Sequence, residues 1–146
     1  MRTTPCIGIC STTYGDLVCR GCKRFAHEIV AWNTYAPAQR DRVWSRLLEL
    51  RDQATAQFVA VVDERTLREV ARAHRIEAGD NASALTLGYE VLRRKARDIA
   101  NVRVVGLEAA AGDRRTAVEL RDAIDAEFHV RSVAYYEHSF HVPVDS

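Results

Sequence analysis

Two short stretches carry every cysteine of the chain: PCIGIC at residues 5–10 and CRGC at residues 19–22. The spacing is C-x3-C-x8-C-x2-C, which is two close pairs separated by a short loop. Such pairs can bring four thiolates to the corners of one tetrahedron, the arrangement that a structural zinc ion or an iron–sulfur cluster requires. The spacing therefore predicts one metal centre with four ligands: Cys6, Cys10, Cys19 and Cys22.

Other uses of four cysteines fit the pattern less well. Two disulfides need an oxidising compartment, and the first residues lack the apolar stretch of a secretory signal. A redox-active C-x-x-C starts a helix after a strand, and no strand-like pattern precedes Cys19. Cysteines that are merely buried would be scattered through apolar segments. A four-thiolate metal site is the interpretation that remains.

The surroundings of the cysteines suit a metal without identifying it. Gly8 and Gly21 let the backbone turn sharply and aim N–H groups at the sulfurs. Arg20, Lys23 and Arg24 flank the second pair and would partly offset the negative charge of a zinc centre or of a cluster. The x3 spacing departs from the C-x2-C pairs usual for zinc, whereas clusters accept uneven spacings. On spacing alone, both metals remain open.

Two helices are expected directly after the cysteines. Phe25, Ile29 and Trp32 recur at helical spacing, and Pro37 suits the first position of a second helix, where its missing N–H costs nothing. The second helix carries an apolar stripe: Val43, Leu47, Leu50 and Ala54. A metal knuckle capped by this helical hairpin would stabilise a domain at residues 1–52 that could otherwise bury little surface.

The cysteines and their glycines are followed by further residues in a recognisable order: Arg24, Glu28, Ile29, Trp32 and Arg40. In this pattern, residues 5–50 resemble a short bacterial domain of unknown function whose members are commonly labelled "predicted Fe–S protein". Members often have glycine at the position of Lys23 and Met-Ser at the position of Tyr35-Ala36. The resemblance implies an iron–sulfur cluster at the four cysteines, and so favours a cluster over zinc.

The remaining chain, residues 53–146, is predicted to form an extension of unknown role. Helical periodicity continues through Phe58, Val61 and Val62, and residues 77–83 are typical of a loop. An amphipathic helix follows, with its apolar positions spaced i, i+4, i+7, i+11 and i+14: Leu85, Tyr89, Leu92, Ala96 and Ile99.

Two strands are expected near the end of this extension. The β-branched runs at residues 102–105 and 130–136 flank a helix that begins at the capping box Thr116-x-x-Glu119. Strand, helix and strand would form a small unit with a right-handed crossover. We therefore expect an α+β fold that is mostly helical.

The composition excludes several classes of function. The chain has 146 residues, and 21 Lys and Arg against 20 Asp and Glu give a net charge of +1, so no overall field attracts it to DNA or to a membrane. No apolar run approaches the roughly 18 to 20 residues of a membrane span. The sequence contains neither a nucleotide-binding glycine loop nor a G-x-S-x-G elbow. We expect a cytoplasmic protein without a membrane partner, and nothing in the sequence argues for an enzyme.

Histidines are further candidate ligands. His138 and His141 lie three residues apart, a spacing that can bind a metal on a helix. Because this segment lacks a helical apolar pattern, we expect an exposed tail instead. His27 follows the cysteines closely, and with four thiolates available we interpret it as a polar helix position.

These observations predict a metal-binding protein, with electron transfer, redox sensing or cluster handling as its role if the centre is a cluster. The alternative is a structural zinc module that presents a surface to a protein or nucleic-acid partner. A basic excess around the cysteines would suit nucleic acid, whereas the run of residues 93–97, rich in Arg and Lys, is typical of a solvated helix face.

Overall fold

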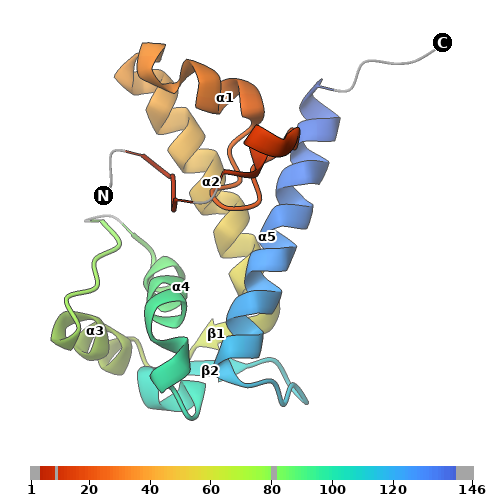
Figure 1. The fold of residues 1–146 in the computed structure, drawn as a ribbon. Helices are drawn as coiled ribbons and strands as arrows, with labels where there is room; N and C mark the ends of the chain where they lie inside the picture. Colours follow the sequence, from red (N-terminus) through yellow and green to blue (C-terminus); the bar gives the residue numbers. More distant parts are fainter. Residues whose placement is uncertain (1–3, 9, 80–81, 141–146) are drawn as a thin grey trace. The chain divides into compact units, whose positions relative to one another are not determined.

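The computed structural model describes residues 4–8, 10–79 and 82–140, and it has the mostly helical α+β architecture that the sequence predicts (Figure 1). No helix in these ranges is long and apolar enough to cross a membrane. The α-helices are α1 (Ala26–Ala31), α2 (Pro37–Phe58), α3 (Glu64–Ala73), α4 (Ala84–Lys95) and α5 (Ala117–Phe140). The strands are β1 (Val59–Val61) and β2 (Leu107–Ala109), and the 3-10 helices are η1 (Ser11–Tyr14), η2 (Trp32–Thr34), η3 (Ala96–Asp98) and η4 (Val102–Val105).

The chain divides into two compact units. The cysteine unit comprises Arg2–Leu50 and Phe128–Ser146, and the sheet unit comprises Arg51–Glu127. Helix α2 therefore contributes residues to both units, and so does α5. The predicted domains, residues 1–52 and 53–146, stay a prediction about which parts of the chain fold independently.

The cysteine unit contains the two helices expected after the cysteines. Helix α1 begins where the Glu28 Oε1 atom accepts the Phe25 N–H at 2.8 Å, and α2 begins at Pro37. An isolated antiparallel bridge joins Val18 to Phe25 and closes the turn between them. The buried apolar residues include Val18, Phe25, Trp32, Val43, Leu47, Leu50 and Phe128. The apolar stripe predicted for α2 is thus part of the core.

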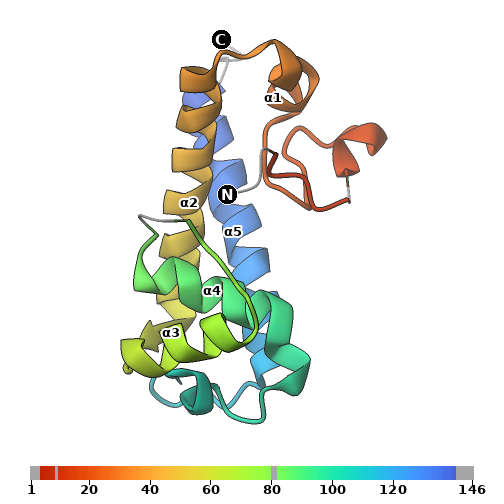
Figure 2. The same cartoon turned by 90° about the vertical axis from the view of Figure 1, so that its left-hand side faces the viewer.

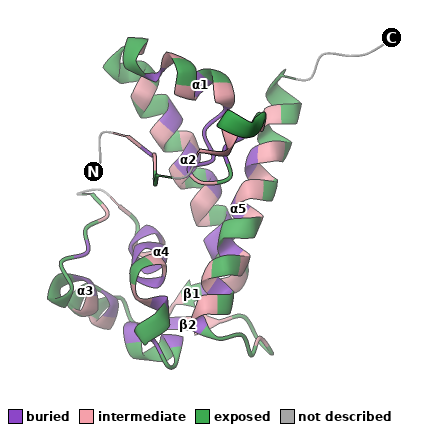
Figure 3. Cartoon of the chain, in the orientation of Figure 1, coloured by how far each residue is buried: buried purple, intermediate pink, exposed green. Residues whose placement is uncertain are grey.

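The sheet unit is built around a short antiparallel pair, β1 with β2, in which Val59 lies opposite Ala109. The turn into β2 requires glycine, because Gly106 has φ +84° and a Cβ there would lie 2.2 Å from the Asp63 carbonyl oxygen. Helices α3 and α4 lie side by side (Figure 2). Helix α4 is buried from Thr86 to Leu92 (Figure 3), so it forms the centre of this unit.

The two predicted strands are wrong. Val102–Val105 form η4, and residues 130–136 continue α5. The preference of β-branched residues for strands depends on context, whereas α5 has a strong local start in which Thr116 and Glu119 each accept the other's backbone N–H. The buried face of α5 continues through this stretch: Leu120, Ile124, Phe128 and Ser132.

The predicted crossover is therefore wrong as well. The sheet of the described chain is antiparallel, and its first strand is Val59–Val61, a segment that helical periodicity assigned to a helix. The prediction failed here because three apolar residues fit either period, and only pairing with β2, far along the chain, selects the strand.

Candidate metal centre

The second cysteine pair lies in a tight turn of the cysteine unit. The Cys19 N–H donates to the Arg24 carbonyl oxygen at 2.9 Å, and the Lys23 N–H donates to the Cys19 carbonyl oxygen at 2.9 Å. Lys23 has φ +68°, in the left-handed region that suits glycine. The glycine that related domains often carry at this position would fit the same turn. Cys19 and Cys22 are both buried.

Hydrogen bonds surround the Cys19 sulfur. Burial disfavours the thiolate and by itself raises the pKa of Cys19. Backbone N–H groups of Cys22, Ser11 and Gly21 donate to the sulfur, and the Cys22 side chain adds a further hydrogen bond. These bonds outweigh burial and lower the pKa of Cys19 from 9.0 to about 7. The N–H groups near Gly21 are therefore aimed at a sulfur, as the sequence predicts.

Cys22 has a different environment. Burial raises the pKa of its thiol, and Arg24 opposes that effect. The Arg24 Nε donates to the Cys22 Sγ at 3.3 Å, and the guanidinium carbon lies 4.9 Å from the centroid of the Trp32 ring. The guanidinium carbon of Arg40 lies 5.6 Å from the same centroid, and its Nε donates to the Trp32 carbonyl oxygen at 3.1 Å. Trp32 thus packs against two cations, one of which touches a cysteine.

The first cysteine pair is half-buried. The Gly8 N–H donates to the Cys6 Sγ at 3.4 Å, and Gly8 has φ +91°, which only glycine adopts easily. The Cys10 Sγ lies 2.9 Å from the Thr12 hydroxyl oxygen. Each sulfur of this pair therefore has a polar partner within its own loop.

Ser11 connects the two pairs. It directly follows Cys10, its N–H donates to the Cys19 sulfur, and its hydroxyl oxygen accepts the Arg20 N–H at 2.8 Å. None of the four cysteines forms a disulfide, and no three His, Cys, Asp or Glu side chains among the described residues lie close enough together to hold a metal ion. The structure thus places the first pair's segment against the second pair without gathering four sulfurs.

Lys23 is fully buried. Its ammonium donates to the carbonyl oxygens of Arg20 and Gly21, the latter at 3.2 Å, and lies 5.4 Å from the centroid of the Phe128 ring. The sequence indicates only that a charged residue follows Cys22. It could not indicate that Lys23 is buried, because Phe128, whose ring its ammonium contacts, lies far along the chain.

An ion pair between α1 and α2 supports the turn. Two nitrogens of the Arg46 guanidinium donate to the two carboxylate oxygens of Glu28 at 2.5 and 2.7 Å. The side chains are 12% and 6% exposed, respectively. The same guanidinium lies over the Phe25 ring, with its carbon 4.0 Å from the centroid. Glu28, Trp32 and Arg40, which carried the resemblance, therefore act as structural supports of the cysteine turn.

The end of α5 adds aromatic side chains that the sequence analysis missed. The Phe25 ring centroid lies 5.0 Å from that of Tyr136 and 5.6 Å from that of Phe140. The His27 ring lies 5.1 Å from the Phe140 ring, centroid to centroid, and His27 is exposed on α1. Phe128, Tyr136 and Phe140 are separated by eight and then four residues, a helical spacing that could have indicated that they share one helix face.

His138 is exposed, as the sequence predicts, but it lies on α5 and not in a tail. His141 lies outside the described residues.

The fold and the site define a class: a small, mostly helical α+β protein with a cysteine-rich module whose turn is supported by arginine side chains. Residues 4–51, about a third of the chain, match the model of a family described as "Protein of unknown function (DUF1289)". This match confirms the resemblance to a domain of unknown function and assigns no activity. No curated protein and no solved structure matches the chain.

Proposed function

We propose that this chain is a metal-binding protein that holds one metal centre through four thiolates: Cys6, Cys10, Cys19 and Cys22. The observation that carries the proposal is the positive environment of the buried sulfurs. Lys23 and Arg24 are at most 5% exposed, and both lie within the turn of the second pair. Positive charge near a sulfur favours its thiolate form. Thiolates bound to a metal would place negative charge beside these two cations.

Donors are aimed at the buried sulfurs themselves. The Arg24 Nε donates to the Cys22 Sγ, and backbone N–H groups donate to the Cys19 sulfur. The buried carboxylate of Glu28 is engaged through both oxygens by Arg46. Metal ligands must be deprotonated, and these donors favour the deprotonated form.

The donor set fits a metal by its chemistry. Four thiolates suit zinc or an iron–sulfur cluster, and hydrogen bonds to sulfur are the usual outer support of such centres. Cys19 and Cys22 would hold the metal from the buried turn, and the half-buried Cys6 and Cys10 would complete the set by a rearrangement of their loop. The label of the resembled domain favours a cluster.

The role depends on the metal. A cluster would supply a one-electron acceptor and donor, which suits electron transfer, redox sensing or cluster handling. Zinc would instead stabilise the cysteine unit, and the unit would then serve as an interaction module for a protein or nucleic-acid partner.

Elemental analysis of the full chain, purified without oxygen, tests the proposal. We expect either iron with acid-labile sulfide and a brown colour, or colourless protein with one zinc per chain. The variant with all four cysteines replaced by serine should contain neither iron nor zinc. The control Thr13→Ala, in the loop between the pairs, should contain as much metal as the wild type. Metal-free wild-type protein, or equal metal in the serine variant, would overturn the proposal.

A further inference from the structure

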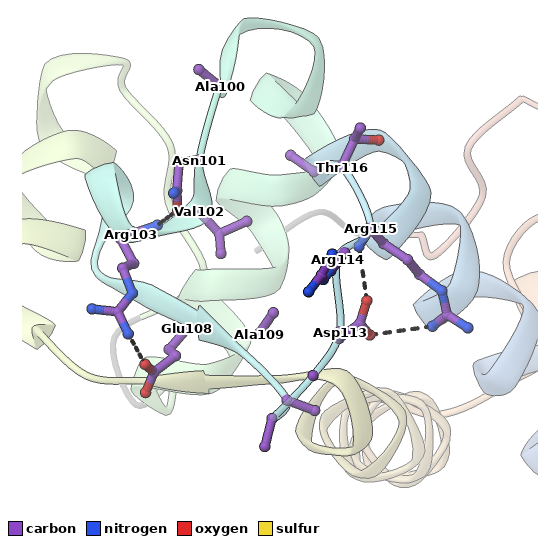
Figure 4. A pocket seen from close by; sticks show the side chains of 14 residues that line it. Ala100, Asn101, Val102, Arg103, Glu108, Ala109, Asp113, Arg114, Arg115 and Thr116 are labelled. Atoms are coloured by element: carbon purple, nitrogen blue, oxygen red, sulfur yellow. Dashed lines mark hydrogen bonds and ion pairs between the residues drawn. The ribbon is translucent and has the colours of Figure 1, made fainter.

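A pocket in the sheet unit lies outside the cysteine module. It has a volume of about 480 Å³ and is formed by η4, β2 and the loop that leads into α5. Figure 4 shows Arg103 on one side and Arg114 and Arg115 on the other, with Val102 and Ala109 between them. The pocket therefore combines apolar side chains with arginines on two sides.

The charges around this pocket favour an anion. Arg103 pairs with Glu108, and Arg115 pairs with Asp113 at 3.5 Å. Each carboxylate occupies part of one guanidinium, which has five N–H groups, so donors remain for a ligand. Arg114 makes no ion pair in the described part of the chain. Three arginines against two carboxylates leave an excess of one positive charge at the pocket.

The loop before α5 is fixed in shape by its own contacts. The Asp113 N–H donates to the Ala110 carbonyl oxygen at 2.9 Å, and the Asp113 Oδ1 accepts the Arg115 N–H at 2.9 Å. The guanidinium carbon of Arg115 lies 5.2 Å from the centroid of the Phe58 ring. Gly112, with φ +79°, permits the turn. Because these contacts hold the loop in one shape, binding would cost little further conformational entropy.

We propose that this pocket binds a small oxyanionic ligand, one that carries phosphate or carboxylate groups. Arg114 is the principal contact, and Arg103 lies on the opposite side of the ligand. The planar guanidinium fork matches the oxygens of both groups. The volume lies in the range of small-molecule sites, roughly 300 to 1,000 Å³, which favours a metabolite over a polymer. This ligand-binding site is separate from the proposed metal centre.

Titration of the ¹⁵N-labelled full chain with pyrophosphate and, separately, with citrate at physiological salt tests the inference. We expect saturable amide shifts concentrated in residues 100–117 with at least one of the two probes. Pyrophosphate alone would identify a phosphate site, and citrate alone a carboxylate site. Arg114→Glu should weaken binding by about tenfold or more, because it replaces a charge-assisted donor with a repelling charge.

The matched control is Arg42→Glu, an exposed arginine on α2 in the cysteine unit, with the same change in net charge. It should bind the probe as the wild type does. The inference is overturned if neither probe binds, if the shifts lie outside the pocket, or if both variants weaken binding equally. The last result would show a general charge effect. Neither probe involves a metal, so the outcome is independent of the metal centre.

Discussion

The Arg24 Nε donates to the Cys22 Sγ at 3.3 Å while the same guanidinium stacks on Trp32. One arginine therefore links a cysteine to the aromatic core of the cysteine unit. Substituting Arg24 should therefore affect both the packing around Trp32 and the protonation of the Cys22 sulfur.

Arg24→Met should slow alkylation of Cys22 in the metal-free protein and weaken metal binding by about tenfold. The reason is that the thiolate loses a charge-assisted hydrogen bond, and such a bond contributes about 1.5 to 3 kcal/mol. Mass spectrometry after timed alkylation and competition with a chelator measure the two effects. Arg40→Met, which also removes a cation from Trp32 but touches no sulfur, should leave the alkylation rate unchanged.

Lys23→Gly should affect both states of the protein. In the metal-free protein it loses the buried side chain and its hydrogen bonds, but glycine relieves the left-handed backbone by about 1 kcal/mol, so the free energy of unfolding should fall less than in Lys23→Ala. In the loaded protein it should weaken metal binding, because the thiolates lose a buried counter-charge. Denaturant unfolding and chelator competition measure both.

The control for Lys23→Gly is Arg75→Gly, since Arg75 is exposed and also has a positive φ, of 55°. It should gain backbone stability without any change in metal affinity. Unchanged metal affinity in Lys23→Gly would show that its ammonium does not balance the sulfurs.

Arg46→Met should destabilise the protein by about 3 to 5 kcal/mol, because it leaves the buried Glu28 carboxylate without its ion-pair partner. Arg65→Met removes a comparable contact, with Glu69, from a surface pair whose side chains are 90% and 59% exposed. It should change the free energy of unfolding by about 0.5 kcal/mol or less. Chemical denaturation compares the two, and equal losses would contradict the role assigned to the buried pair.

Gly106→Ala should destabilise the sheet unit by about 3 kcal/mol, because a Cβ would clash with the Asp63 carbonyl oxygen in addition to the left-handed strain. Gly112→Ala has the same strain but no atom within 4 Å of the added Cβ. Its cost should be only about 1 kcal/mol. Thermal unfolding distinguishes them, and similar losses would mean that the contact with Asp63 is not tight.

The reactivity of Cys19 in the metal-free protein should follow its lowered pKa. Alkylation should reach half its maximal rate near pH 7, whereas a thiol with the ordinary pKa of 9.0 would do so two pH units higher. A lowered folded-state pKa stabilises the fold above the unfolded value, and this contribution is lost as the pH falls through about 7. Stability should therefore rise between pH 7 and 9.

Cys19→Ser should remove this rise, and Cys22, whose pKa burial raises, should titrate at higher pH. A rise that persists in Cys19→Ser would assign the pH dependence to another group.

Local patterns were sufficient for part of the fold. Pro37 and the stripe of Val43, Leu47 and Leu50 predicted α2, and Thr116 with Glu119 predicted the start of α5. These signals succeed because capping and periodicity act within a few residues. They failed for Val59–Val61, where the partner strand lies far along the chain.

The sequence by itself determined the two cysteine pairs, the glycine turn at Gly8 and the helices that follow. Only the tertiary structure decided that Lys23 is buried and that Phe25 packs against the aromatic end of α5. It also brought Arg103 and Arg114 to opposite sides of one pocket. The physical reason is that burial and charge pairing depend on segments that are distant in the chain. A local sequence pattern does not indicate which distant segment will pack against it.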